Sequence, residues 1–212
     1  MVFYQIEVPV ACSMIELAEH ANHPFQKYFC VWAAFNNIYT LVSQRNGLIV
    51  QPKLDRLGQR RTERKWTYIF PSVDQPKEHD QIKEVVSALD IGTKNTLISH
   101  PNIPFFVERT PHGVLSKHDD FGQLINGVLN VTRTINPQSP IWSPINKQAY
   151  GRYSAGDQSE INLLAEQIIF MLYTIRNNLV HGSKNPGEEN DMRVVQNALP
   201  LLELVVRAFI RR

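Results

Sequence analysis

The chain has 212 residues, 43% of them hydrophobic, and a formal net charge of +2 at neutral pH. This length suits one domain with a buried core, and the small net charge permits a polyanionic partner without requiring one. Cys12 and Cys30 are too few for a disulfide framework, which favours a reducing, cytoplasmic setting. No window reaches the apolar length of a membrane span, and residues 1–14 lack the basic start of a signal peptide.

The N-terminal part predicts two helices after a short extended arm over residues 1–10. Ala11 to Asn22 are predicted to form a short helix, and Pro24 opens a much stronger one. Its face is apolar and aromatic at spacings of three and four, with Phe25, Tyr28, Trp32, Phe35, Tyr39 and Val42. Asn36 falls at the edge of this face, where a hydrogen bond inside a helical bundle and a role in substrate binding both fit.

The helical pattern breaks over residues 46–117, which predicts an irregular insertion. Lys53 to Lys65 has six Lys or Arg residues, including Arg60 and Arg61, and is followed by Trp66. Such a loop can bind an RNA backbone and stack a base, and it can equally be a solvated insertion.

The rest of this stretch is predicted to hold a short surface helix, His79 to Leu89, and a long irregular excursion, Ile91 to Pro111. Three histidines lie in this region without a nearby His or Cys partner, so they predict no metal site. They are His100, His112 and His118.

The second half predicts three helices. The first covers Asp119 to Ile135, and the Pro-rich stretch Asn136 to Gly156 is predicted to be a loop. Asp157 and Glu160 have capping-box spacing for a helix over about 158–180. The last helix covers about 188–210, with a bend near Asn197 caused by Pro200. The short turn before it predicts that the last two helices are antiparallel neighbours.

A candidate site lies where the helix over 158–180 ends, in the run from Arg176 to His181. Arg176 borders the apolar stripe, and a helix C-terminus favours the protonated imidazole of His181. A guanidinium binds non-bridging phosphate oxygens and an imidazole moves a proton near neutral pH, so the pair suits phosphoryl chemistry. The spacing alone is a weak signal in a chain with thirteen Arg and seven His residues. An ion pair of Arg176 with a neighbouring helix fits as well.

The run I-R-N-N-L-V-H-G resembles the motif of the HEPN family (higher eukaryotes and prokaryotes nucleotide-binding). In that family an Arg, a polar residue and a His four to six residues after the Arg close the third helix of a four-helix bundle. Residues 29–39, F-C-V-W-A-A-F-N-N-I-Y, are similar to the first core helix of the Apea-like branch, with Asn36 where that branch often has Glu.

This resemblance covers about half the chain and implies an all-α, single-domain protein. The implied fold is a HEPN-like four-helix up-down bundle with an irregular insertion between its first and second core helices. The core helices fall at about 25–44, 119–135, 158–180 and 188–210, and the insertion at about 46–117.

Family members that keep both the Arg and the His are metal-independent endoribonucleases. The resemblance therefore implies that His181 assists attack of a 2′-hydroxyl on the adjacent phosphate, Arg176 stabilises the developing charge, and Asn177 orients the pair. The products are 2′,3′-cyclic phosphate and 5′-hydroxyl ends, and no metal or other cofactor is implied. The candidate substrate-binding residues are Asn36, Lys184, Arg60 and Arg61.

The implied partners are RNA, a second copy of the chain and an antitoxin protein, because toxin–antitoxin and phage-defence systems are the usual settings of the family. A homodimer in contact along the 161–179 helix would join two Arg176–His181 tips in one cleft. A second hypothesis is a non-catalytic HEPN module that binds RNA, nucleotide or a partner protein. A third is a plain helical scaffold.

Overall fold

The computed structural model describes residues 8–46, 77–108, 145–180 and 186–210, and every element in these ranges is a helix. The all-α prediction is thus confirmed for this part of the chain. Among these helices, none combines the length and the apolar character needed to cross a bilayer. The predicted helix over 119–135 and the basic loop with Arg60 and Arg61 lie outside the described residues.

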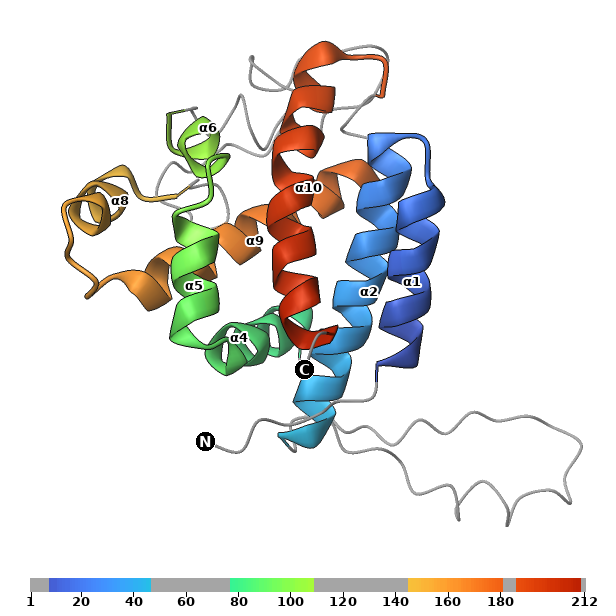
Figure 1. Ribbon diagram of the computed structural model, residues 1–212, viewed down its shortest axis with the longest axis horizontal. Coiled ribbons are helices and arrows are strands. Elements are labelled where there is room, and N and C mark those ends of the chain that lie inside the picture. Colours follow the sequence, from blue (N-terminus) through green and yellow to red (C-terminus); the bar gives the residue numbers. More distant parts are fainter. Residues whose placement is uncertain (1–7, 47–76, 109–144, 181–185, 211–212) are drawn as a thin grey trace, which may run out of the picture.

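Two N-terminal helices, α1 (Pro9–His20) and α2 (Pro24–Arg45), follow each other closely, and both have Pro in the first turn. Proline suits this position because its missing N–H has no helical partner there anyway. Both predicted helices are confirmed. Helix α1 begins at Pro9, so the last two residues of the extended arm expected over residues 1–10 are helical instead. In Figure 1, α1, α2 and α10 (Glu189–Ile210) stand side by side.

The prediction of an irregular chain is wrong for three short helices, α5 (Ile91–Ile98), α6 (Ile103–Glu108) and α8 (Lys147–Ser154). Capping explains two of them, since side-chain oxygens satisfy the free N–H groups of the first turn. Asp90 accepts a hydrogen bond from the Thr93 N–H at 2.8 Å, and Asn146 caps α8 in the same way. Pro104 falls in the first turn of α6, where proline is tolerated.

The predicted surface helix after residue 78 is confirmed as α4 (Glu78–Ala88), which has one exposed face and one face directed into the core. Ile82, Val85 and Val86 are buried, so one face of α4 belongs to the core. The stretch expected to be an insertion therefore supplies part of the hydrophobic interior.

The helix that carries the motif, α9 (Ile161–Val180), starts later than the capping box predicts. Asp157 accepts a hydrogen bond from the Ser159 N–H at 2.9 Å, which closes a local turn before the helix. Glu160 does not fold back to Asp157 but pairs with Arg152 at 2.5 Å. The two side chains that were expected to open the helix are thus used in the turn before it.

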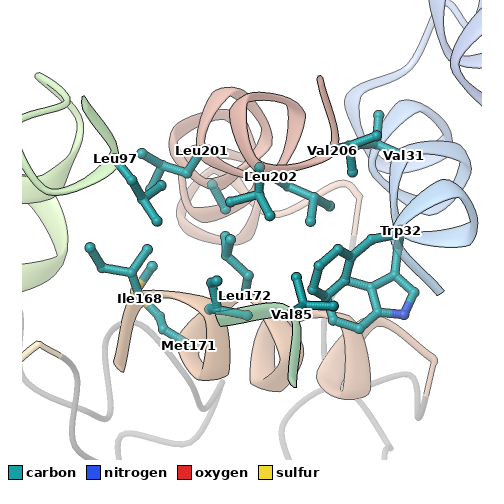
Figure 2. Packing of buried hydrophobic residues seen from close by; sticks show 14 of the residues in the cluster. Val31, Trp32, Val85, Leu97, Ile168, Met171, Leu172, Leu201, Leu202 and Val206 are labelled. Atoms are coloured by element: carbon teal, nitrogen blue, oxygen red, sulfur yellow. The ribbon is translucent and has the colours of Figure 1, made fainter. Parts of the chain in front are cut away.

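The last two helices cross instead of pairing along their lengths, so the prediction of antiparallel neighbours is wrong. α9 passes behind α10 in Figure 1, and Figure 2 shows α10 nearly end-on above a horizontal α9. Helix α10 continues through Pro200. Near that proline, the Asn102 side-chain amide donates to the Asn197 carbonyl at 3.1 Å, which ties the chain before α6 to α10.

The buried hydrophobic residues form one cluster, and α9 contributes side chains to it along its whole length, from Ile161 to Leu179. Leu172 of α9 points toward Leu202 of α10, with Val85 and Trp32 beside it (Figure 2). A buried hydrogen bond of 2.8 Å from the Tyr28 hydroxyl to the Leu172 carbonyl joins α2 to α9. The apolar stripe of α9 is therefore buried within one protomer, so a dimer contact along this helix, as expected from the sequence, would have to use its exposed residues.

Gly156 ends α8 in a left-handed conformation, with φ of 98°. The Gly156 N–H bonds to the Tyr153 carbonyl and the Asp157 N–H to the Arg152 carbonyl, the pattern of a Schellman cap. We expect Gly156→Ala to lower the free energy of unfolding by about 1–2 kcal/mol, because a Cβ is disfavoured at this φ. Urea unfolding measures the loss.

The matched control is Gly151→Ala in the interior of α8, where an added Cβ meets nothing within 4 Å. Alanine is the better helix former there, so this variant should gain about 0.5–1 kcal/mol. Equal effects of the two substitutions would contradict the cap.

His100 gives the fold a predicted dependence on pH. Its Nδ1 accepts the Asn102 N–H at 3.2 Å, and burial lowers the pKa of the imidazole from its ordinary 6.5. The folded state then binds the proton less tightly than the unfolded state. The contribution of His100 to stability is therefore fully present above pH 6.5 and is lost as the pH falls toward the pKa of the folded state. Urea unfolding between about pH 7 and pH 5 should show the wild type losing stability relative to His100→Asn. A difference that stays constant over this range would contradict the prediction.

Candidate functional site

Arg176 and Asn177 lie near the C-terminal end of α9 and are joined by a hydrogen bond. The Nη1 of Arg176 donates to the Oδ1 of Asn177 at 2.8 Å. The guanidinium carbon lies 5.9 Å from the ring centroid of Trp32, a distance at which a cation is attracted to an aromatic face. Trp32 itself is 3% exposed, so the arginine packs against a fixed ring of α2. The half-buried guanidinium is thus held from two sides.

No carboxylate in the described ranges forms an ion pair with Arg176. The structural alternative raised by the sequence, a salt bridge to a neighbouring helix, is therefore not found among these residues. A guanidinium has five N–H donors in a planar fork, and its bond to Asn177 uses one of them. With respect to the part of the chain that the structure describes, the other donors stay open to a phosphate or a carboxylate.

Aromatic rings line the contact between α2 and α9 beside Arg176. Trp32 lies 6.0 Å from Tyr173 and 5.1 Å from Phe35, and Phe35 lies 5.5 Å from Tyr39, all measured between ring centroids. Tyr39 and Trp32 are seven residues apart on one face of α2, and Tyr173 and Arg176 are three apart on α9. The site is thus built where two helix faces meet.

Glu78, the first residue of α4, completes this cluster. The Tyr39 hydroxyl donates to the Glu78 Oε1 at 2.5 Å. Burial raises the pKa of Tyr39 well above its usual range, and the hydrogen bond to Glu78 and its charge raise it further, while the charge of Arg176 acts in the opposite direction. Tyr39 therefore stays protonated at physiological pH, as a donor to a carboxylate and within the electrostatic reach of Arg176.

Two buried donors beside these residues have no hydrogen-bond partner within the described part of the chain, the Trp32 Nε1 and the Asn178 Nδ2. An unpaired buried polar group costs about 1–3 kcal/mol, so such groups are rare in folded proteins. Figure 2 shows the Trp32 nitrogen on the side of its ring that faces away from Leu172. Near Arg176, the α2–α9 contact thus contains buried hydrogen-bond donors that have no acceptor among the described residues.

The structure places three of the candidate residues. Arg176 and Asn177 are brought together, and Asn36 is exposed. The interpretation of Asn36 as a residue at the edge of the buried face is therefore wrong, and it is Asn37 that has a buried side-chain oxygen. The other candidates, His181, Lys184, Arg60 and Arg61, lie outside the described residues.

Sequence reasoning did not single out Tyr39 and Glu78 as site residues. Tyr39 was recognised only as part of an apolar stripe, and Glu78 lies at the border of the predicted surface helix. No local pattern connects residues that are 39 positions apart.

Among the described residues, no group of three or more His, Cys, Asp or Glu side chains has an arrangement that could hold a metal ion. Comparison of the chain with profiles of known protein families, with curated proteins and with solved structures finds no match.

Proposed function

We propose that the chain is a metal-independent endoribonuclease of the HEPN type, in which Arg176 binds an RNA phosphate and His181 transfers protons. The observation that supports this most directly is the half-buried guanidinium of Arg176, which is held by Asn177 and Trp32 and has no carboxylate partner in the described ranges. A cation that is fixed but not neutralised suits an anionic ligand.

The proposed reaction is an internal transfer at one phosphodiester. His181 takes the proton of a 2′-hydroxyl, the 2′-oxygen bonds to the adjacent phosphorus, and the bond from phosphorus to the 5′-oxygen breaks. The leaving 5′-oxygen takes a proton back from the imidazolium of His181, which gives a 2′,3′-cyclic phosphate and a 5′-hydroxyl. Arg176 stabilises the charge that grows on the non-bridging oxygens. DNA lacks the 2′-hydroxyl and is not a substrate.

A homodimer would supply two such tips. One Arg and one His are few for a reaction that needs charge stabilisation and two proton transfers. A two-fold axis brings the same patch of both protomers together. Val180, the last residue of α9, is 51% exposed and lies four residues from Arg176, so it is an apolar contact available at the tip.

Mixing variants tests the shared cleft. Arg176→Ala and His181→Ala proteins are each expected to be inactive, and their mixture should regain part of the activity, since heterodimers hold one intact Arg and one intact His. Sedimentation gives the oligomeric state at the assay concentration. A monomer at micromolar concentration that cuts RNA would contradict the dimer while leaving the nuclease proposal intact.

The nuclease itself is tested with a single-stranded RNA and a DNA of the same sequence, in the presence of EDTA. RNA cleavage should survive chelation, rise with pH through about 6–7 and be lost in His181→Ala. DNA should stay intact. RNA binding that depends on Arg176 but is never followed by cleavage would instead favour the non-catalytic HEPN module.

A further inference from the structure

Three helices bring a carboxylate, a phenol and a guanidinium together at the α2–α9 contact. Glu78 begins α4, Tyr39 comes from the second half of α2, and Arg176 lies near the C-terminal end of α9. The chain of neighbouring rings from Tyr39 through Phe35 and Trp32 reaches the guanidinium. His79, next to Glu78, stacks on Phe170 with 4.1 Å between ring centroids, which places the start of α4 against the helix of Arg176. The charge of Glu78 raises the pKa of Tyr39 and that of Arg176 lowers it.

The carboxylate of this group does not pair with the guanidinium. Glu78 accepts the short hydrogen bond of 2.5 Å from Tyr39, and Arg176 donates to the neutral amide oxygen of Asn177. A carboxylate and a phosphate make the same bidentate use of an arginine fork, so a carboxylate bound there would compete with a phosphate. The Tyr39 hydroxyl thus binds the Glu78 carboxylate, which could otherwise compete with a phosphate for Arg176.

We propose that Tyr39 holds the Glu78 carboxylate away from Arg176 and thereby keeps the guanidinium available to an RNA phosphate. Tyr39 is then a positioning residue, and Glu78 is an internal competitor for the phosphate site. The RNA part of this inference rests on the proposed function, whereas the placement of Glu78 does not.

The placement is tested without RNA by a double-mutant cycle of Glu78→Gln and Arg176→Ala, measured by urea unfolding. The cycle is run once in the wild-type background and once in Tyr39→Phe. In the wild-type background the two substitutions should be additive. In Tyr39→Phe the released carboxylate pairs with Arg176, and the coupling should be about two- to fivefold in the unfolding equilibrium constant. Equal coupling in both backgrounds would overturn the proposal.

Phosphate access is tested by fluorescence anisotropy with a 2′-O-methyl RNA of about twelve nucleotides, a length that exceeds one binding site and a chemistry that cannot be cleaved. Tyr39→Phe should weaken binding by about two- to fivefold, and adding Glu78→Gln should restore it. General damage to the fold would not be rescued by the second substitution. A loss that Glu78→Gln does not restore would overturn the proposal.

Tyr153→Phe is the matched control, since that hydroxyl bonds to the Asn95 side chain at 2.9 Å in another part of the protein. Its RNA affinity should equal that of the wild type. Arg176→Ala should weaken binding more than Tyr39→Phe does. If Arg176→Ala left binding unchanged, the proposed phosphate site and the RNA part of the inference would fail together, and the unfolding cycles would still decide whether Tyr39 holds Glu78.

Discussion

Arg176→Ala is expected to lower the rate of RNA cleavage by about 10²–10³-fold, the usual loss when a preorganised donor to a developing negative charge is removed. Arg176→Lys should recover only a small part of this rate, because an ammonium is a point charge without the planar fork. Single-turnover cleavage of a labelled RNA at saturating protein concentration measures the chemical step apart from binding.

The control for this experiment is Arg207→Ala, which removes a half-buried arginine that pairs with Glu19 at 3.1 Å near the far end of α10. That variant should cleave at the wild-type rate. Because Arg176 also packs on Trp32, urea unfolding of each variant separates loss of chemistry from loss of fold. Wild-type cleavage by Arg176→Ala would exclude this residue from the site.

Leu172→Ala is expected to lower the free energy of unfolding by about 2–5 kcal/mol. The Leu172 side chain is completely buried where α9 crosses α10, α4 and α2, so its removal leaves a cavity among rigid helices. Its backbone carbonyl still accepts the Tyr28 hydroxyl, which confines the loss to packing. The shift of the urea midpoint at an unchanged slope gives the value.

Leu163→Ala on the same helix is the matched control. Leu163 is 42% exposed, so the same chemical change should alter stability by about 0.5 kcal/mol or less. Similar losses in the two variants would mean that the crossing of α9 and α10 is packed differently from Figure 2.

The sequence by itself determined the long helices. In α2, α9 and α10 the apolar period continues for twenty residues or more, and each observed helix agrees with its expected range to within a few residues. The short helices α5, α6 and α8 were missed, because six to eight residues are too few to establish a period. Proline and glycine there indicated loops, while capping by Asp90 and Asn146 favoured helices.

For the candidate site, too, the sequence determined one part of the arrangement and the tertiary structure the other. The order of residues in one helix is enough to place Arg176 and Asn177 together near the end of α9, since neighbours in sequence are neighbours in space. The tertiary structure alone decided what faces them. Trp32 reaches Arg176 because the C-terminal end of α9 lies against α2, and Glu78 meets Tyr39 because α4 packs its apolar face into the same core. Periodicity shows which residues a helix buries, and it contains no information on which other helix buries them.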